Sequence, residues 1–143
     1  MIGAKQGDSR VQALLEQLEL KYDVDNDGDF RVGFELENGR AQLGFIRSET
    51  TQFGKFDIRE IFAVAHISEG PLPADLANAL LIYNAHVKLG SWRIERQSDG
   101  KCVVAFAVQI AADTDAVSLY TALRLVIDTA DNIERKLAEE DKF

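Results

Sequence analysis

The sequence predicts a single α+β domain in which an antiparallel sheet packs against helices, with the element order α-β-β-β-α-β-β-α. Apolar residues recur every three or four positions in three segments of the chain. Between those segments they alternate with polar residues, which is typical of half-buried strands. Asn38-Gly39 and Asp99-Gly100 separate alternating segments and favour hairpins, so neighbouring strands are expected to be antiparallel. The domain is expected to include residues 1–143, with a core from about 9 to 137.

The first expected helix covers residues 9–20. Ser9 and Gln12 fit a capping box, in which side chains bond to the free backbone N–H groups at the start of a helix. Its apolar residues recur at helical spacing and predict one buried side, made of Val11, Leu14, Leu15 and Leu18.

Three strands are expected after this helix. Apolar and polar residues alternate over 30–36, and Asn38-Gly39 predicts a tight two-residue turn into a return strand over 41–45. A third strand is expected over 56–67, where the alternation gives way to a nearly continuous apolar run. This run predicts either burial on both sides of the strand or a bulge near Glu60.

A second helix is expected from Ala74 to about Leu89. Pro73 suits its first turn, because proline has the backbone angle of a helix and lacks only an N–H group that would be unpaired there. Gly90 is a natural stop signal. The apolar stripe of this helix consists of Leu76, Leu80, Tyr83 and Val87.

A hairpin and a long third helix complete the expected fold. One strand begins at Trp92, Asp99-Gly100 turns the chain, and a second strand returns over 102–110. Asp113 or Thr114 is expected to cap the helix that follows. The buried stripe of that helix is expected to contain Ala116, Leu119, Leu123, Val126, Ala130, Ile133 and Leu137.

Charge and composition exclude several classes of function. The chain has 16 Lys and Arg against 24 Asp and Glu, a net charge of −8, which disfavours nucleic acids and anionic membrane surfaces as partners. No apolar run approaches the ~20 residues that span a bilayer. Residues 1–6 contain no apolar stretch typical of an export signal, and a single cysteine fits a reducing compartment. We therefore expect a cytoplasmic protein.

Residues 23–29 partly match the start of a calcium-binding loop, with aspartates at positions one, three and five and glycine at six. Position twelve should be a bidentate glutamate, but it is Phe34, and Glu35 is one residue late. The favoured interpretation is a polar hairpin turn with Asp27-Gly28 at its corner. Whether the loop binds an ion stays open.

His66 and His86 are the only histidines and hence the only general-base candidates of that type. Neither lies in a recognisable catalytic motif, and two histidines with one cysteine are few for a zinc site. Cys102 opens an apolar strand and is expected to be a small buried residue rather than a nucleophile. We therefore expect no enzyme activity, no metal and no cofactor.

Trp92 is the only tryptophan and lies at a helix–strand junction. One interpretation is a core anchor at that junction. The other is an aromatic anchor at an interface, a position in which tryptophan is enriched.

A resemblance to known proteins is carried by four segments: Leu80-Leu81-Ile82-Tyr83-Asn84, Gly90-Ser91-Trp92-Arg93-Ile94, the Asp99-Gly100 turn, and Ala130-Asp131-Asn132-Ile133. Their order resembles the type III secretion chaperone-like fold, in which an "LL-x-x-N" helix leads to a hairpin and a closing helix. Within that fold, the chain is most similar to the YbjN-like domain family of bacterial proteins. The resemblance covers roughly residues 9–137.

This resemblance implies a homodimer without catalysis. In secretion chaperones the dimer seam is built largely by the middle helix and an adjoining strand. For this sequence, the resemblance implies that four residues contact a second copy or another partner: Leu76, Leu80, Tyr83 and Trp92.

Three hypotheses of function follow. The leading one is a non-enzymatic, chaperone-like or regulatory module that binds itself and an unidentified client protein, with an acidic rim that favours basic or neutral clients. The alternative is a small-molecule or ion sensor with a ligand near Trp92 and His86. The least favoured is a small enzyme that uses His66 or His86 as a base.

Overall fold

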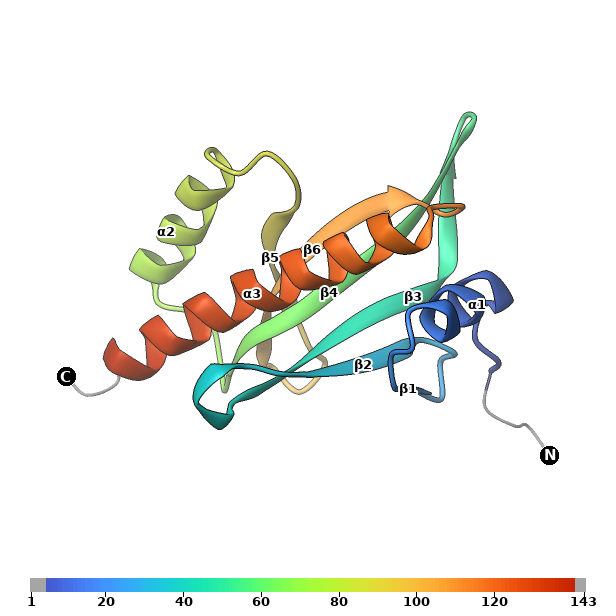
Figure 1. Cartoon of the computed structure of the whole chain (residues 1–143). Coiled ribbons are helices and arrows are strands. Elements are labelled where there is room, and N and C mark those ends of the chain that lie inside the picture. The colour runs from blue at the N-terminus through green and yellow to red at the C-terminus, as the bar shows by residue number, and fades with distance from the viewer. Residues whose placement is uncertain (1–4, 141–143) are drawn as a thin grey trace.

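A computed structural model describes residues 5–140 as one antiparallel sheet with helices on one face (Figure 1). The α+β class and the element order expected from the sequence are confirmed, with one additional short strand after the first helix. The elements are α1 (Ser9–Gln17), β1 (Tyr22–Val24), β2 (Phe30–Glu35), the 3-10 helix η1 (Glu37–Gly39), β3 (Ala41–Phe53), β4 (Phe56–Ser68), α2 (Ala74–Asn84), β5 (Ser91–Arg96), β6 (Cys102–Ala111) and α3 (Ala116–Glu140).

The sheet has six strands in the order β1-β2-β3-β4-β6-β5, so β5 lies at one edge. Within the described part of the chain, no helix is both long and apolar enough to cross a membrane. Residues 1–4, most of the N-terminal segment that contains no apolar stretch, lie outside the described residues.

The long helix α3 crosses the sheet over β3, β4 and β6 and forms the centre of the core (Figure 1). A Cβ atom on Gly44 of β3 would lie 2.9 Å from Leu123 and 3.0 Å from Ile127 of this helix, so glycine permits the close approach of α3 to the sheet. The predicted stripe of α3 is confirmed: Ala116, Leu119, Leu123, Val126 and Ala130 are buried, Ile133 packs against the core and Leu137 is half-buried.

The two faces of the sheet differ in what covers them. On β4, Ile61 and Ala63 are fully buried under the helices, whereas Phe62 and Val64 point to the opposite face and are half-buried. In the described chain no helix packs on that opposite face, which we call the uncovered face. Its side chains are Leu43, Phe45, Arg47, Glu60, Phe62, Val64, Ile67, Arg93, Val103, Ala105, Ala107 and Gln109, together with the strand neighbours they pair with.

A strand irregularity lies near Glu60, but not on the strand where it was expected: the bulge of β4 itself lies between Val64 and His66. The register between β3 and β4 breaks between the pairs Ile46–Ile61 and Thr50–Arg59, so the extra residues lie on β3 opposite Glu60. Beyond the break, β3 and β4 continue, and past the last pair of β4 with β6, Ile58–Ala111, they form a two-stranded arm of residues 52–57 that projects past the sheet (Figure 1). The strand after Asn38-Gly39 is therefore much longer than the expected 41–45.

The cap residues of two helices were predicted wrongly. Asp8 rather than Ser9 caps α1, because its Oδ1 accepts a hydrogen bond from the Arg10 N–H at 2.8 Å. For α3 the cap is Asp115, not Asp113 or Thr114. Its Oδ1 accepts a hydrogen bond from the Ser118 N–H at 2.7 Å, which lowers the pKa of Asp115. In both helices an aspartate next to an expected cap accepts the first free N–H groups instead.

The second helix ends at Asn84, five residues before the expected end near Leu89. The Asn84 side chain bonds to the backbone of Trp92: its Nδ2 donates to the carbonyl at 3.1 Å, and its Oδ1 accepts from the N–H at 2.6 Å. This pair of bonds holds the helix end against the edge strand β5. Gly90 enters that strand with φ of +87° instead of stopping the helix.

Two other boundaries also differ. The turn at Asn38-Gly39 is a three-residue 3-10 turn, closed by the Leu36 N–H and the Arg40 carbonyl at 2.7 Å, not a two-residue turn. The first helix ends at Gln17 instead of residue 20, because Glu19 has φ of +58° and leaves helical geometry.

Candidate protein-binding surfaces

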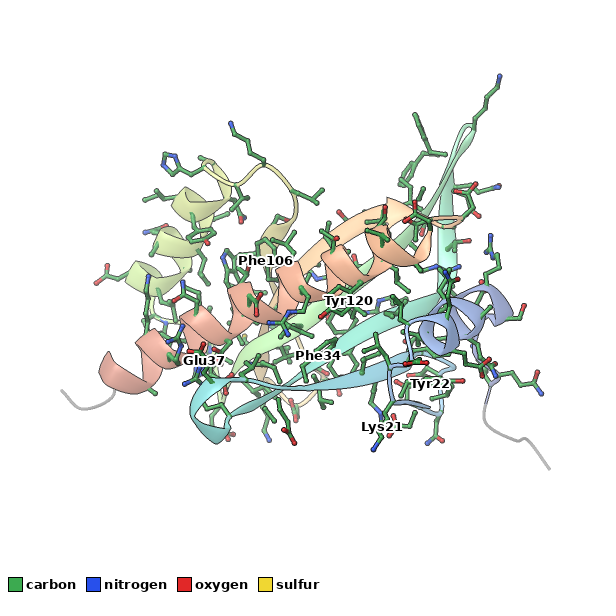
Figure 2. The ribbon with its side chains drawn as sticks, in the orientation of Figure 1. Lys21, Tyr22, Phe34, Glu37, Phe106 and Tyr120 are labelled. Atoms are coloured by element: carbon green, nitrogen blue, oxygen red, sulfur yellow. The ribbon has the colours of Figure 1, made fainter. Side chains whose placement is uncertain are left out.

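The loop with the partial calcium motif is a hairpin, as the polar-turn interpretation predicted. Its strands β1 and β2 are paired, and Gly28 turns the corner with φ of +85°. The Asp25 Oδ1 accepts the N–H groups of Asp27 and Asp29 at 2.9 and 3.0 Å, so this carboxylate holds the turn. Phe34, at position twelve, packs edge-on against Tyr120 of α3 with ring centres 6.2 Å apart (Figure 2).

The histidines and the cysteine lie on three separate elements. His66 is half-buried on β4 and lines a shallow groove of about 390 Å³ with Glu134 and Leu137 of α3. His86 is exposed in the loop that follows α2, two residues beyond its end at Asn84. Cys102 is 3% exposed, which confirms it as a small buried residue. Among the described residues, no group of three or more His, Cys, Asp or Glu side chains is placed to hold a metal ion.

The four residues expected at a dimer seam are packed within the chain itself. Leu80 and Trp92 are each only 4% exposed, and Leu76 and Tyr83 are partly buried against the same core. The Trp92 ring lies edge-on to Tyr83 and to Phe106, with centres 6.2 and 5.2 Å apart. Trp92 is therefore a core anchor of the single chain, and a partner in this region would meet the opposite side of α2.

That opposite side of α2 exposes two large apolar side chains next to Asp75 and Asn78. Leu81 is 67% and Ile82 63% exposed, while Leu80 beside them is buried. Leu89, in the loop that follows, is half exposed as well. Sequence reasoning singled out only the buried stripe. The run Leu80-Leu81-Ile82 was the available signal, because three consecutive apolar residues in a helix cannot all face one core.

An aromatic and charged cluster forms the middle of the uncovered face. Phe45 and Phe62 are stacked, with ring centres 4.9 Å apart and planes at 11°. The guanidinium groups of Arg47 and Arg93 lie over the Phe62 ring, 4.7 and 5.8 Å from its centre. The side chain of Arg93 extends from β5 across β6 and bonds to Glu60 on β4. It can cross β6 because its pairing partner there, Ala105, has a small side chain.

Glu60 holds this cluster together. Its Oε2 accepts from Arg93 Nη1 at 2.7 Å and from Gln109 at 3.0 Å, and its Oε1 accepts from Arg93 Nη2 and from Arg47 at 3.2 Å. Burial raises the pKa of Glu60, but the hydrogen bonds and charges of these partners outweigh it and hold the pKa at about 2. The carboxylate is therefore ionised and fully engaged, which leaves it unsuited to act as a general base at neutral pH.

The arm extends the uncovered face beyond the sheet. Phe53 and Phe56 face each other across its turn and are 62% and 72% exposed. Between the arm and the Glu60 cluster lies an open groove of about 620 Å³, lined on one side by Phe53 and Ile58 and on the other by Arg47 and Glu60.

Comparison with known proteins finds no match among family models, curated proteins or solved structures. The surfaces described above are therefore the basis for any statement about function.

Proposed function

We propose that this chain is a non-enzymatic protein-binding module, chaperone-like or regulatory, that acts as a cytoplasmic homodimer. The observation that carries the proposal is the pair of exposed apolar side chains on α2. Large apolar side chains on a surface helix normally face the core, yet Leu81 and Ile82 are exposed in the single chain, beside the polar residues Asp75 and Asn78. A second copy of α2 would cover them in a two-fold contact, in which each copy presents the same residues.

The resemblance to the YbjN-like family and to secretion chaperones supports the same surface. In those chaperones the middle helix and the adjoining strand build the seam, and here these elements are α2 and β5. Because Leu80 and Trp92 are used within the chain, the proposed seam shifts to Leu81 and Ile82.

Light scattering coupled to size-exclusion chromatography tests the homodimer. We expect the purified chain at twice its mass of 15.9 kDa, and the double variant Leu81→Asp/Ile82→Asp at the mass of one chain with an unchanged circular dichroism spectrum. Val117→Asp is the matched control, because Val117 is 75% exposed on a different helix and its replacement should leave the dimer intact. A monomeric parent chain, or a double variant that stays dimeric, would contradict the proposal.

One observation favours a small-molecule sensor as a second candidate. The indole Nε1 of Trp92 is buried and has no hydrogen-bond partner among residues 5–140, a situation that costs about 1–3 kcal/mol. A ligand with an acceptor group would relieve that cost. Thermal-shift screening of metabolites should then reveal compounds that raise the melting temperature of the parent chain but not of Trp92→Phe, and a flat response would count against a sensor.

A further inference from the structure

We infer that the uncovered face of the sheet binds an extended polypeptide segment in which apolar residues are interspersed with lysine or arginine. The inference rests on the proposed protein-binding function and adds to it the surface and the chemistry of the client. It uses a surface other than the α2 side assigned to the homodimer.

The apolar character of this face is continuous across the strands. Strand pairing places Phe62 between Phe45 and Ala107, and a separate pair joins Ile67 to Val103. Ile67 is 57% exposed, and Leu43, two residues from Phe45 on the same strand, is 48% exposed. The solvent-facing side of an antiparallel sheet normally carries polar residues. A continuous group of exposed apolar residues on that side is typical of a surface that binds a partner.

The arm lengthens this apolar group in the direction of the strands. Phe56, Ile58, Glu60 and Phe62 are spaced two residues apart on β4 and therefore share a face. Phe53 pairs with Phe56 and joins the same side. A surface that is long, narrow and apolar fits an extended segment better than a compact domain.

The charges around this apolar group identify the client as basic. Arg47 and Arg93 lie on the Phe62 ring and share Glu60, so their positive charge is already partnered. The carboxylates at the margin are exposed. Glu35, beside Ala41, has no ion-pair partner among the described residues; Glu95, beside Val103, lies 3.3 Å from Arg93; and Glu49, whose side chain is 88% exposed at the groove, lies 4.0 Å from Lys5.

An exposed acidic margin around an apolar centre attracts cationic side chains. It repels nucleic acids and anionic lipids, which would otherwise compete for a surface with partly exposed arginines. A second copy of this chain, with its net charge of −8, is also a poorer match for the face than a basic segment.

The test uses two labelled synthetic peptides of 15 residues, about the number needed to follow the face from arm to far edge at roughly 3.3 Å per residue. One alternates leucine and valine with lysine, and the other replaces every lysine by glutamate. Fluorescence anisotropy should show the lysine peptide binding at least about tenfold more tightly, since 1.4 kcal/mol corresponds to that factor. The preference should shrink as salt is raised.

Variants assign the binding to the face. Leu43→Ser/Ile67→Ser should weaken the lysine peptide about tenfold, and Glu35→Gln/Glu95→Gln should weaken it several-fold, mostly at low salt. All four side chains are exposed or at least 40% accessible, so folding should survive, which a circular dichroism melt checks. Equal binding of the two peptides, or unchanged binding by both variants, would overturn the inference.

The α2 variant separates this inference from the homodimer. Leu81→Asp/Ile82→Asp should become monomeric and still bind the lysine peptide. Peptide binding by a parent chain that is itself monomeric would leave the inference standing while the homodimer fails. A dimer that falls apart in Leu43→Ser/Ile67→Ser would show that a second copy occupies the uncovered face, and would overturn the inference.

Discussion

Arg59 and Glu60 are neighbours on β4, and their side chains leave the strand on opposite faces of the sheet. Arg59 points toward the helices and is only 1% exposed. Its Nη1 donates to the carbonyls of Arg47 and Ser48 at 2.7 and 3.0 Å, and its Nη2 donates to Asp8 at 2.9 Å. Glu60 points to the uncovered face, where its side chain remains 19% exposed.

The two ion-pair clusters differ in burial, and the difference determines whether each one stabilises the fold or shapes the surface. The carbonyls that Arg59 binds belong to the irregular part of β3, where the register with β4 breaks. Buried backbone groups need partners, so Arg59 supplies the bonds that the interrupted strand pairing does not. On the other face, Glu60 orders two arginines over an aromatic ring, and water can replace part of what a variant removes. The first cluster holds the fold together, and the second shapes a surface.

Replacing Arg59 should have the largest effect on stability. In Arg59→Met the two carbonyls and Asp8 lose their donor inside the core, and we expect a loss of about 3 kcal/mol or more, as is usual when one member of a buried ion pair is removed. Urea unfolding followed by circular dichroism measures this directly.

Asp8→Asn provides the matched comparison on the other side of the Arg59 pair. Hydrogen bonds from Arg10, and then from Arg59, hold the pKa of Asp8 well below its usual range, so its charge belongs to the same cluster. We expect a smaller loss than for Arg59→Met, because the backbone carbonyls keep their donor. Equal stability of Arg59→Met and the parent chain would contradict the structural task assigned to Arg59.

The Glu60 cluster should make the free energy of unfolding depend on pH in the acidic range. The pKa of Glu60 is about 2 in the folded chain against an ordinary value of 4.5, so the folded state binds fewer protons than the unfolded state between these values. The stabilisation is fully present above about pH 4.5 and is lost as the pH falls toward 2. Unfolding in urea at pH 7, 5, 4 and 3 should therefore show a steeper loss for the parent chain than for Glu60→Gln.

At pH 7 the same substitution should cost about 1–2 kcal/mol, because charge-assisted hydrogen bonds are lost while glutamine keeps one acceptor. Asp8 is present in both proteins, so its contribution to the pH dependence of stability is the same in each. Parallel pH profiles for Glu60→Gln and the parent chain would show that the carboxylate contributes nothing beyond its shape.

The order of elements could be predicted because it follows from local periodicity. The stripe of α3 and the strand pairs around Asp99-Gly100 depend on residues close in sequence, and both appear as expected. Helix ends were less predictable, because several nearby residues can serve as the cap or the stop. The end of α2 at Asn84 depends on a bond to the Trp92 backbone, and α1 and α3 are capped by Asp8 and Asp115, each next to a residue that could also cap the helix.

The surfaces were the least predictable part. Helical spacing correctly assigned Leu80 to the buried stripe of α2, but it does not show that Leu81 and Ile82 stay exposed without a second element to cover them. The Glu60 cluster combines residues from four strands, with Arg47, Glu60, Arg93 and Gln109 each on a different one. No local pattern joins them, because their proximity is created by the strand order of the sheet.

The smallest effect is expected from Asp23 and Arg31, which also form an ion pair next to the uncovered face. Their side chains are 66% and 42% exposed and face each other across β1 and β2 at 2.6 Å. Exposed cross-strand pairs contribute about 0.2–1 kcal/mol, so Asp23→Asn should cost less than about 0.5 kcal/mol, and the difference should vanish in 1 M salt. Urea unfolding at 0.1 and 1 M sodium chloride measures both. A loss comparable to that of Glu60→Gln would mean that this pair is shielded from water in solution, and therefore that another chain covers this margin of the sheet.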